Sequence, residues 1–167
     1  MEPIDADFIE QTAFFMFNLT KNQLDERIAD LKNRQFGIYN LITISNSDYK
    51  NQEKKDYAFR MALVIIRIME SYDVKLPMIS IKTIKELMAA DIKSSERIDK
   101  SIPEDERLDF SLSKIGQPHY IAYLKEMVSN DEKYHEIFTI EESHNNYFCV
   151  TAIAMIYVKT IERYSIL

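Results

Sequence analysis

Two Glu-x-x-His motifs are the parts of this sequence whose residue types and spacing are best suited to chemistry. They are Glu132 with His135 and Glu141 with His144. Residues three apart lie on the same face of a helix, so each motif could present a carboxylate and an imidazole to one metal ion. A carboxylate–histidine metal-binding helical enzyme is therefore one hypothesis for the function.

Helical di-iron bundles use such a unit twice and add one glutamate from each of two other helices. Glu70, which stands among apolar residues, could be one of these, but the sequence offers no convincing second. The first turn of a helix also favours carboxylates, which explains Glu132 and Glu141 without a metal. The two motifs are nine residues apart and would converge only if the chain folded sharply near residues 138–139. We therefore expect no metal and no other cofactor.

A second group of charged residues stands in the most apolar stretch of the chain. Arg60, Arg67 and Glu70 lie within a run that is otherwise almost entirely hydrophobic. A buried charge is costly unless it is paired. One interpretation is a buried cluster held by helical Arg67–Glu70 and Asp56–Arg60 pairs. The other is a groove in which a partner supplies the counter-charge.

Four phenylalanines cluster in the first predicted helix, which is more ring area than one buried stripe needs. Phe8 and Phe15 fall on the predicted buried line with Thr12, whereas Phe14 and Phe17 lie away from it. Aromatic side chains dominate the energetics of interfaces, so an exposed Phe14 or Phe17 would suit a contact with a partner or within a homodimer. The alternative is a broad face inserted between two neighbouring helices.

The stretch 93–118 differs from the rest of the chain because it is polar and charged. We expect only a short helix within it, over about 102–110, and interpret the stretch as a connecting segment that is mobile or faces a partner. Its acidic residues are candidates for docking on a basic partner surface, steered by charge. They are Glu104, Asp105, Glu106 and Asp109.

Several catalytic and nucleotide-binding signatures are missing from the sequence. Gly37 and Gly116 are its only glycines, so neither a dinucleotide fingerprint nor a phosphate-binding loop can form. Gly-x-Ser-x-Gly, His-Glu-x-x-His and Cys-x-x-Cys are also absent,. Cys149 stands alone in an apolar run, which favours a buried packing role over a reactive thiol. The sequence thus favours a protein that is not an enzyme.

Acidic residues outnumber basic ones by 27 to 21, which gives a formal net charge of −6. This balance opposes binding to the phosphates of nucleic acids. The longest apolar runs, 61–66 and 148–158, fall short of the ~20 residues that a bilayer requires. The acidic N-terminus is unlike a secretory signal. We therefore expect a cytoplasmic protein that binds neither nucleic acid nor membrane.

Helix starts are marked by capping boxes, in which Ser or Thr is followed three residues later by Glu or Gln. The four boxes are Thr20–Gln23, Ser101–Glu104, Ser129–Glu132 and Thr139–Glu142. With apolar residues at helical spacing, they predict an all-α, single-domain globular bundle of about seven helices over residues 1–167. The predicted helices cover about 5–18, 21–45, 50–72, 81–92, 118–128, 130–138 and 140–164.

Two of these helices, 50–72 and 140–164, are apolar on nearly every side over residues 59–69 and 147–158. A helix of this kind belongs in the middle of a protein. We predict that the two lie side by side at the centre, wrapped by the amphipathic helices. Only the outer faces of the bundle then remain for recognition.

These patterns favour a small acidic helical protein-interaction module, such as an inhibitor, an adaptor or a regulatory subunit. Its partner would be another protein, and a basic surface on that partner is electrostatically easier to approach. A self-assembling structural subunit is a third hypothesis, beside the metal-binding enzyme.

Overall fold

The predicted all-α fold class is confirmed by a computed structural model, which describes residues 2–72, 76–98, 113 and 115–165. Within these ranges the chain forms eight α-helices and no β-strand. The helices are α1 (Ala6–Phe17), α2 (Lys21–Arg34), α3 (Phe36–Ser45), α4 (Gln52–Glu70), α5 (Ile81–Ile98), α7 (Pro118–Asn130), α8 (Glu132–Ile137) and α9 (Ile140–Ser165). None of the helices in these ranges combines the length and the apolar character needed to cross a bilayer.

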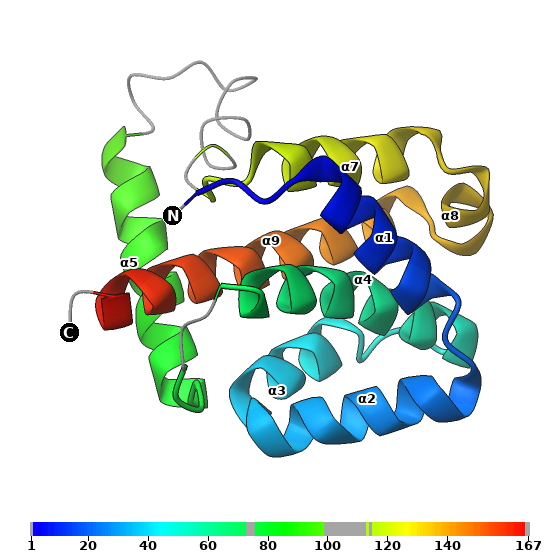
Figure 1. Ribbon diagram of the computed structural model, residues 1–167, viewed down its shortest axis with the longest axis horizontal. Coiled ribbons are helices and arrows are strands. Elements are labelled where there is room, and N and C mark those ends of the chain that lie inside the picture. Colours follow the sequence, from blue (N-terminus) through cyan, green and yellow to red (C-terminus); the bar gives the residue numbers. More distant parts are fainter. Residues whose placement is uncertain (1, 73–75, 99–112, 114, 166–167) are drawn as a thin grey trace.

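The two helices predicted to be central, α4 and α9, run side by side through the middle of the molecule (Figure 1). Helices α1 and α7 lie on one side of this pair, α2 and α3 lie on the other, and α5 lies across the end of α9. The core of α4 is buried from Met61 to Ile66, and that of α9 includes Ile153, Ala154 and Tyr157. The predicted arrangement of two central apolar helices is confirmed.

Neither central helix is buried on every side. Phe59 is only half-buried on α4, and Phe148 on α9 keeps 60% of its surface exposed. Both were expected in the core because they belong to apolar runs. The neighbouring helices cover α9 over only part of its circumference at Phe148, so the ring faces outward.

The predicted helix over 21–45 is wrong in one respect, because it breaks at Gln35 into α2 and α3. Gln35 has φ −137° and ψ 63°, which no helical residue adopts,. Its buried side chain donates from Nε2 to the carbonyl oxygen of Pro77 at 3.1 Å and accepts from the amide of Ile79 at 2.8 Å. The break thus places one side-chain amide where it satisfies two backbone groups of a distant segment.

Gly37 brings the start of α3 against that same segment. A Cβ atom at this position would lie 2.2 Å from the carbonyl oxygen of Ile79 and 2.9 Å from Cδ1 of Ile84. Within a helix considered alone, Gly37 is only a weak point. The structure shows that it is required for the close approach between α3 and the chain that leads into α5.

Two of the four predicted capping boxes are confirmed. Thr20 and Gln23 exchange both bonds, with lengths of 2.9 and 3.3 Å. Thr139 and Glu142 do the same at 2.8 and 3.2 Å. These boxes fix where α2 and α9 begin.

The box predicted at Ser129 is wrong, and the box predicted at Ser101 lies outside the described residues. Helix α7 continues past Ser129 to Asn130, and Asp131 caps α8 by accepting from the amide of Tyr134 at 3.1 Å. The charged carboxylate of Asp131 is a stronger hydrogen-bond acceptor than the hydroxyl of Ser129, and Asp131 stands immediately before the first residue of α8,.

The polar stretch predicted over 93–118 begins within a helix. Ser80 caps α5, since its hydroxyl accepts from the amide of Thr83 at 3.1 Å. However, α5 continues to Ile98, beyond the predicted end near residue 92. The short helix predicted over 102–110 lies outside the described residues.

We predict that Gly37→Ala destabilises the protein, although the same change in an ordinary exposed helix would add about 1 kcal/mol of stability. The new methyl group meets backbone atoms that cannot move aside without displacing the segment at Ile79, which should cost about 1–3 kcal/mol. Urea denaturation measures the loss. Asn33→Ala, on the exposed face of α2, is the control and should change stability by less than about 0.5 kcal/mol. An unchanged or raised stability of Gly37→Ala would contradict this account.

Candidate functional site

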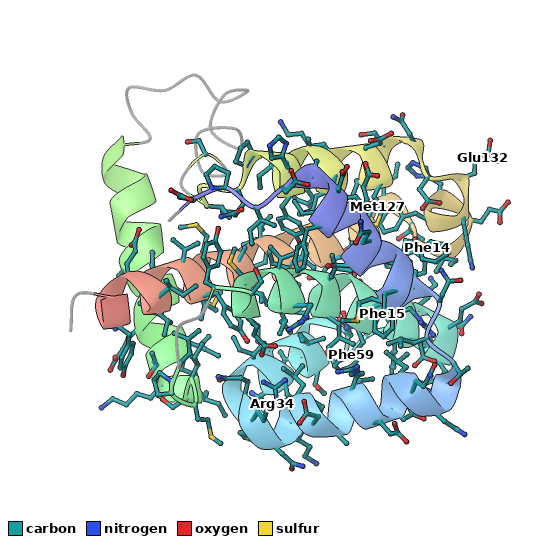
Figure 2. The ribbon with its side chains drawn as sticks, in the orientation of Figure 1. Phe14, Phe15, Arg34, Phe59, Met127 and Glu132 are labelled. Carbon is teal, nitrogen blue, oxygen red and sulfur yellow. The ribbon has the colours of Figure 1, made fainter. Side chains whose placement is uncertain are left out.

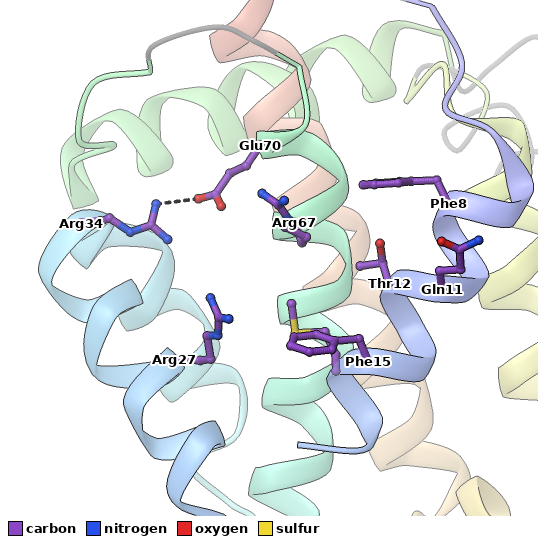
Figure 3. A pocket seen from close by; sticks show the side chains of 9 residues that line it. Phe8, Gln11, Thr12, Phe15, Arg27, Arg34, Arg67 and Glu70 are labelled. Atoms are coloured by element: carbon purple, nitrogen blue, oxygen red, sulfur yellow. Dashed lines mark hydrogen bonds and ion pairs between the residues drawn. The ribbon is translucent and has the colours of Figure 1, made fainter. Parts of the chain in front are cut away.

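An open groove with a volume of about 630 Å³ lies between α1, α2 and α4 (Figure 3). Helix α4 forms its floor, and α1 and α2 form its two walls. Its lining consists of Phe8, Gln11, Thr12, Phe15 and Met16 from α1, Arg27 and Arg34 from α2, and Arg67 and Glu70 from α4. Aromatic rings and guanidinium groups therefore share one surface.

The α1 wall exists because only one side of α1 packs on the core. Ile9, Ala13 and Met16 are buried, while Phe14 keeps 74% and Phe15 keeps 50% of its surface exposed. Figure 2 shows both side chains on α1, with Phe15 on the side toward α4. Of the two interpretations of Phe14, the exposed ring is the one that the structure has. The expected burial of Phe15 is wrong, because α4 covers the face of α1 that is centred between positions 9, 13 and 16.

Phe17 differs from Phe14 in its surroundings. Its ring is half-buried and meets the ring of Tyr57 edge to face, with centroids 4.9 Å apart. Such pairs stabilise a fold beyond the area they bury. Phe17 therefore fastens α1 to α4, and Phe14 is the one of the two predicted partner-binding aromatics that faces outward.

Arg60 holds the end of α1 in place. Its guanidinium donates to the carbonyl oxygen of Met16 at 2.7 Å and to that of Leu19 at 2.9 Å. These carbonyls belong to the end of α1 and the residues that follow it, where no helical partner remains. The expected Asp56–Arg60 pair does not form, since the carboxylate of Asp56 accepts from Lys21 at 2.8 Å.

The predicted buried cluster of Arg60, Arg67 and Glu70 is also wrong. Arg67 is exposed, and the half-buried carboxylate of Glu70 accepts from Arg34 of α2 at 3.0 Å. The dashed line in Figure 3 marks this ion pair across the groove. Glu70 turns to α2 because Arg34 lies opposite it there, which leaves Arg67 without the partner that helical spacing suggested.

Arg34 is a structural element of the site. It also binds Asp30 at 2.8 Å, one turn earlier on α2. Burial acts to lower the pKa of Arg34, but its hydrogen bonds to Asp30 and Glu70 outweigh burial and raise that pKa. The pair with Glu70 fixes the spacing between α2 and α4 at one end of the groove.

Two arginines of the groove have no such partner. In the ranges that the structure describes, neither Arg27 nor Arg67 lies within ion-pair distance of a carboxylate. Arg27 lies over the ring of Phe15, with its guanidinium carbon 5.9 Å from the ring centroid. The groove thus carries three guanidinium groups against one carboxylate, in a chain whose net charge is −6.

The two Glu-x-x-His motifs do not form a metal centre. Glu132 and His135 are exposed on α8, and Glu141 and His144 are exposed at the start of α9. Figure 2 shows Glu132 at the outer edge of the molecule. Among the described residues, no group of three or more His, Cys, Asp or Glu side chains could hold a metal ion. The chain does break between α8 and α9, near residues 138–139, but the side chains of both motifs are exposed, so the break does not bring them together as ligands.

Glu142, beside the second motif, has a structural role. Its carboxylate accepts from Lys54 of α4 at 2.7 Å and from the amide of Thr139 at 2.8 Å. Burial acts to raise the pKa of Glu142, but the hydrogen bonds from Lys54 and Thr139 outweigh burial and lower that pKa. The charged form of Glu142 is therefore the one that the fold favours.

Cys149 is buried, as expected, and burial raises the pKa of its thiol to about 11. The reactive form of a cysteine is the thiolate. A thiol with this pKa stays protonated at neutral pH, which fits a packing role for Cys149 and not a nucleophilic one.

The acidic residues predicted to dock on a basic partner lie outside the described residues. They are Glu104, Asp105, Glu106 and Asp109. Their docking role stays a prediction.

The groove contains residues that reasoning from the sequence missed, chiefly Arg27, Arg34 and Gln11. One signal was available, since Arg27 and Arg34 are seven residues apart and therefore share a face of α2,. What faces them across the groove depends on how α1 and α2 lie on α4, which no spacing within one helix reveals.

Comparisons with models of protein families, with curated proteins and with solved structures find no match to this chain. The function must therefore be argued from the geometry and charge of the groove itself.

We predict that Glu142→Gln makes the stability of the protein less sensitive to acid. In the folded state the pKa of Glu142 is lowered, so its contribution is present above the ordinary glutamate value of about 4.3 and is lost as the pH falls through the folded pKa. A glutamine side chain can still accept a hydrogen bond from the amide of Thr139, but it cannot form the ion pair with Lys54. Loss of the ion pair should lower the free energy of unfolding by up to about 1 kcal/mol at neutral pH.

Urea denaturation at pH 7 and at pH 3 measures this effect. The difference in stability between the two pH values should be smaller for Glu142→Gln than for the unaltered protein. Glu141→Gln, at an exposed position on the same turn, is the matched control. If both variants kept the full difference, the assigned role of Glu142 would be wrong.

Proposed function

We propose that the protein is a non-enzymatic interaction module that binds another protein through the groove between α1, α2 and α4. One observation carries this proposal: the exposed ring of Phe15 shares the groove with Arg27 and Arg67. In the described residues, neither arginine has a carboxylate partner. Exposed aromatic rings beside arginine side chains are typical of surfaces that bind other proteins.

The composition of the groove supports a protein partner. Aromatic residues and arginine are enriched at the energetic centres of protein interfaces, where they combine apolar area with directed hydrogen bonds. Phe8 and Phe15 offer rings, and Arg27 and Arg67 offer guanidinium groups beside them. Phe14, which is still more exposed, extends the apolar surface along the outer side of α1.

The placement of the reactive residue types supports a role other than catalysis. His119, His135 and His144 are exposed on three different helices, and Cys149 is buried with a raised pKa. An enzyme of the common nucleophilic type needs a nucleophile and a base within hydrogen-bond reach of each other.

The cytoplasmic location and the docking of a basic partner on the acidic residues 104–109 stay predictions from the sequence.

We predict that a photo-reactive p-benzoylphenylalanine at position 11 forms a discrete adduct with a second protein in the cells that make this chain. Gln11 lines the groove and is exposed, so a bound partner would lie within reach. The same probe at position 82, on the exposed side of α5, is the control and should give no such adduct. Denaturing gels and mass spectrometry of the adducts measure the outcome.

The adduct at position 11 should disappear in Phe15→Ala and in Arg67→Glu. Arg67 is exposed and Phe15 keeps half of its surface exposed, so both variants should stay folded, with unchanged circular dichroism and an unfolding midpoint that falls by no more than about 4 °C,. Adducts that are equal at positions 11 and 82, or that survive both substitutions, would contradict the proposal. An adduct that contains only a second copy of this chain would favour the self-assembling subunit instead.

A further inference from the structure

We propose that the occupant of the groove is an acidic amphipathic helix of the partner protein, an inference that rests on the proposed function of the groove. The lining of the groove indicates the charge, the apolar side chains and the backbone conformation of this occupant.

The charge of the occupant follows from the unpaired guanidinium groups of Arg27 and Arg67. Several other cations of the described chain are paired within the fold, as Lys21 is with Asp25 and Asp56, and Lys54 is with Glu142. What distinguishes Arg27 and Arg67 is that both line one groove together with Phe15. A guanidinium group offers a planar fork of N–H donors that matches a carboxylate with two bonds. Carboxylates on the occupant would therefore supply the counter-charges that the groove lacks.

The attraction between the two arginines and a carboxylate acts only over a short distance. At physiological ionic strength, electrostatic interactions are screened beyond about 8 Å. An acidic protein with a net charge of −6 repels other acidic surfaces in general, yet attracts a carboxylate that reaches Arg27 or Arg67. The groove should therefore select partners whose acidic residues are concentrated on the docking segment.

The apolar side chains of the occupant follow from the α1 wall. Phe8 and Phe15 line the groove from that side, and Met16 lies at its base. Arg27 lies against the ring of Phe15 and thereby places a cation next to an apolar surface,. An occupant that fits both has apolar residues on one face and carboxylates beside them, which is the pattern of an amphipathic segment.

The backbone of the occupant follows from the helices that form the groove. An extended peptide usually binds by adding a strand to an open sheet edge, whose unpaired amides and carbonyls hold it. In the described ranges there is no strand, and the groove is formed by three helices whose backbone groups bond internally. A helix satisfies its own backbone and needs only side-chain contacts, so it is the conformation that suits this groove.

The proposal can be tested without knowing the partner, by selection from a displayed library of random peptides. Peptides of about 16 residues allow about four helical turns. Peptides selected on the unaltered protein should be enriched in Asp and Glu, with apolar residues at positions i, i+3 or i+4, and i+7. Selection on the double variant Arg27→Glu/Arg67→Glu should lose the acidic enrichment. Neutral or basic peptides from the unaltered protein would overturn the proposal.

The strongest selected peptide, made synthetically with a fluorescent label, gives the affinity by anisotropy. Arg27→Glu/Arg67→Glu should weaken binding by about tenfold or more, since two attractive contacts become repulsive. Lys85→Glu/Lys133→Glu changes the net charge by the same amount at exposed positions on α5 and α8, and should weaken binding by less than about twofold. Equal losses in the two double variants would overturn the proposal.

Two further measurements separate the remaining outcomes. Circular dichroism of the complex should show a gain of helix when the peptide binds, and a peptide that stays unstructured would overturn the helical occupant. Displacement of the peptide by millimolar inorganic phosphate would identify a phosphate site and overturn it as well. If position 11 gives adducts in cells but the selected peptides are not acidic, this inference fails and the proposed function stands. If acidic peptides bind but position 11 gives no adduct, the proposed function fails.

Discussion

The burial of α4 is the constraint on which the rest of this structure depends. Ten of its residues are buried, from Tyr57 to Met69, and α9 and α1 both pack along it. A helix that is apolar on most of its surface is stable only when other helices cover it. Each surrounding helix therefore takes its place from the side of α4 that it covers.

The groove is a consequence of how α4 is covered. Helix α1 is fastened to α4 by Ile9, Ala13 and Met16, by the Phe17–Tyr57 contact, and by the bonds of Arg60. Helix α2 is held at the other side by the Arg34–Glu70 ion pair. Because these contacts hold α1 and α2 apart, the surface of α4 around Arg67 remains open between them. The same contacts that stabilise the fold thus create the cationic, aromatic surface that we assign to binding.

Local sequence patterns predicted those features that are decided within a single helix. The capping boxes at Thr20 and Thr139 are such features, because their hydrogen bonds join residues only three positions apart. Patterns failed where a distant residue competes for the same group. Glu70 accepts from Arg34 and not from Arg67, and Gln35 leaves the helix to bond at Pro77 and Ile79.

The sequence by itself determined that the protein is helical and that the segments around 59–69 and 147–158 form its centre, because hydrophobic periodicity and apolar length act through the chain alone. Only the tertiary structure decided where the charges lie. Helical spacing can place Arg67 and Glu70 on one face, but which of them finds a partner depends on the residue that another helix brings opposite. Arg27, Phe15 and Arg67 come from three separate helices, and packing on α4 is what brings them to one groove.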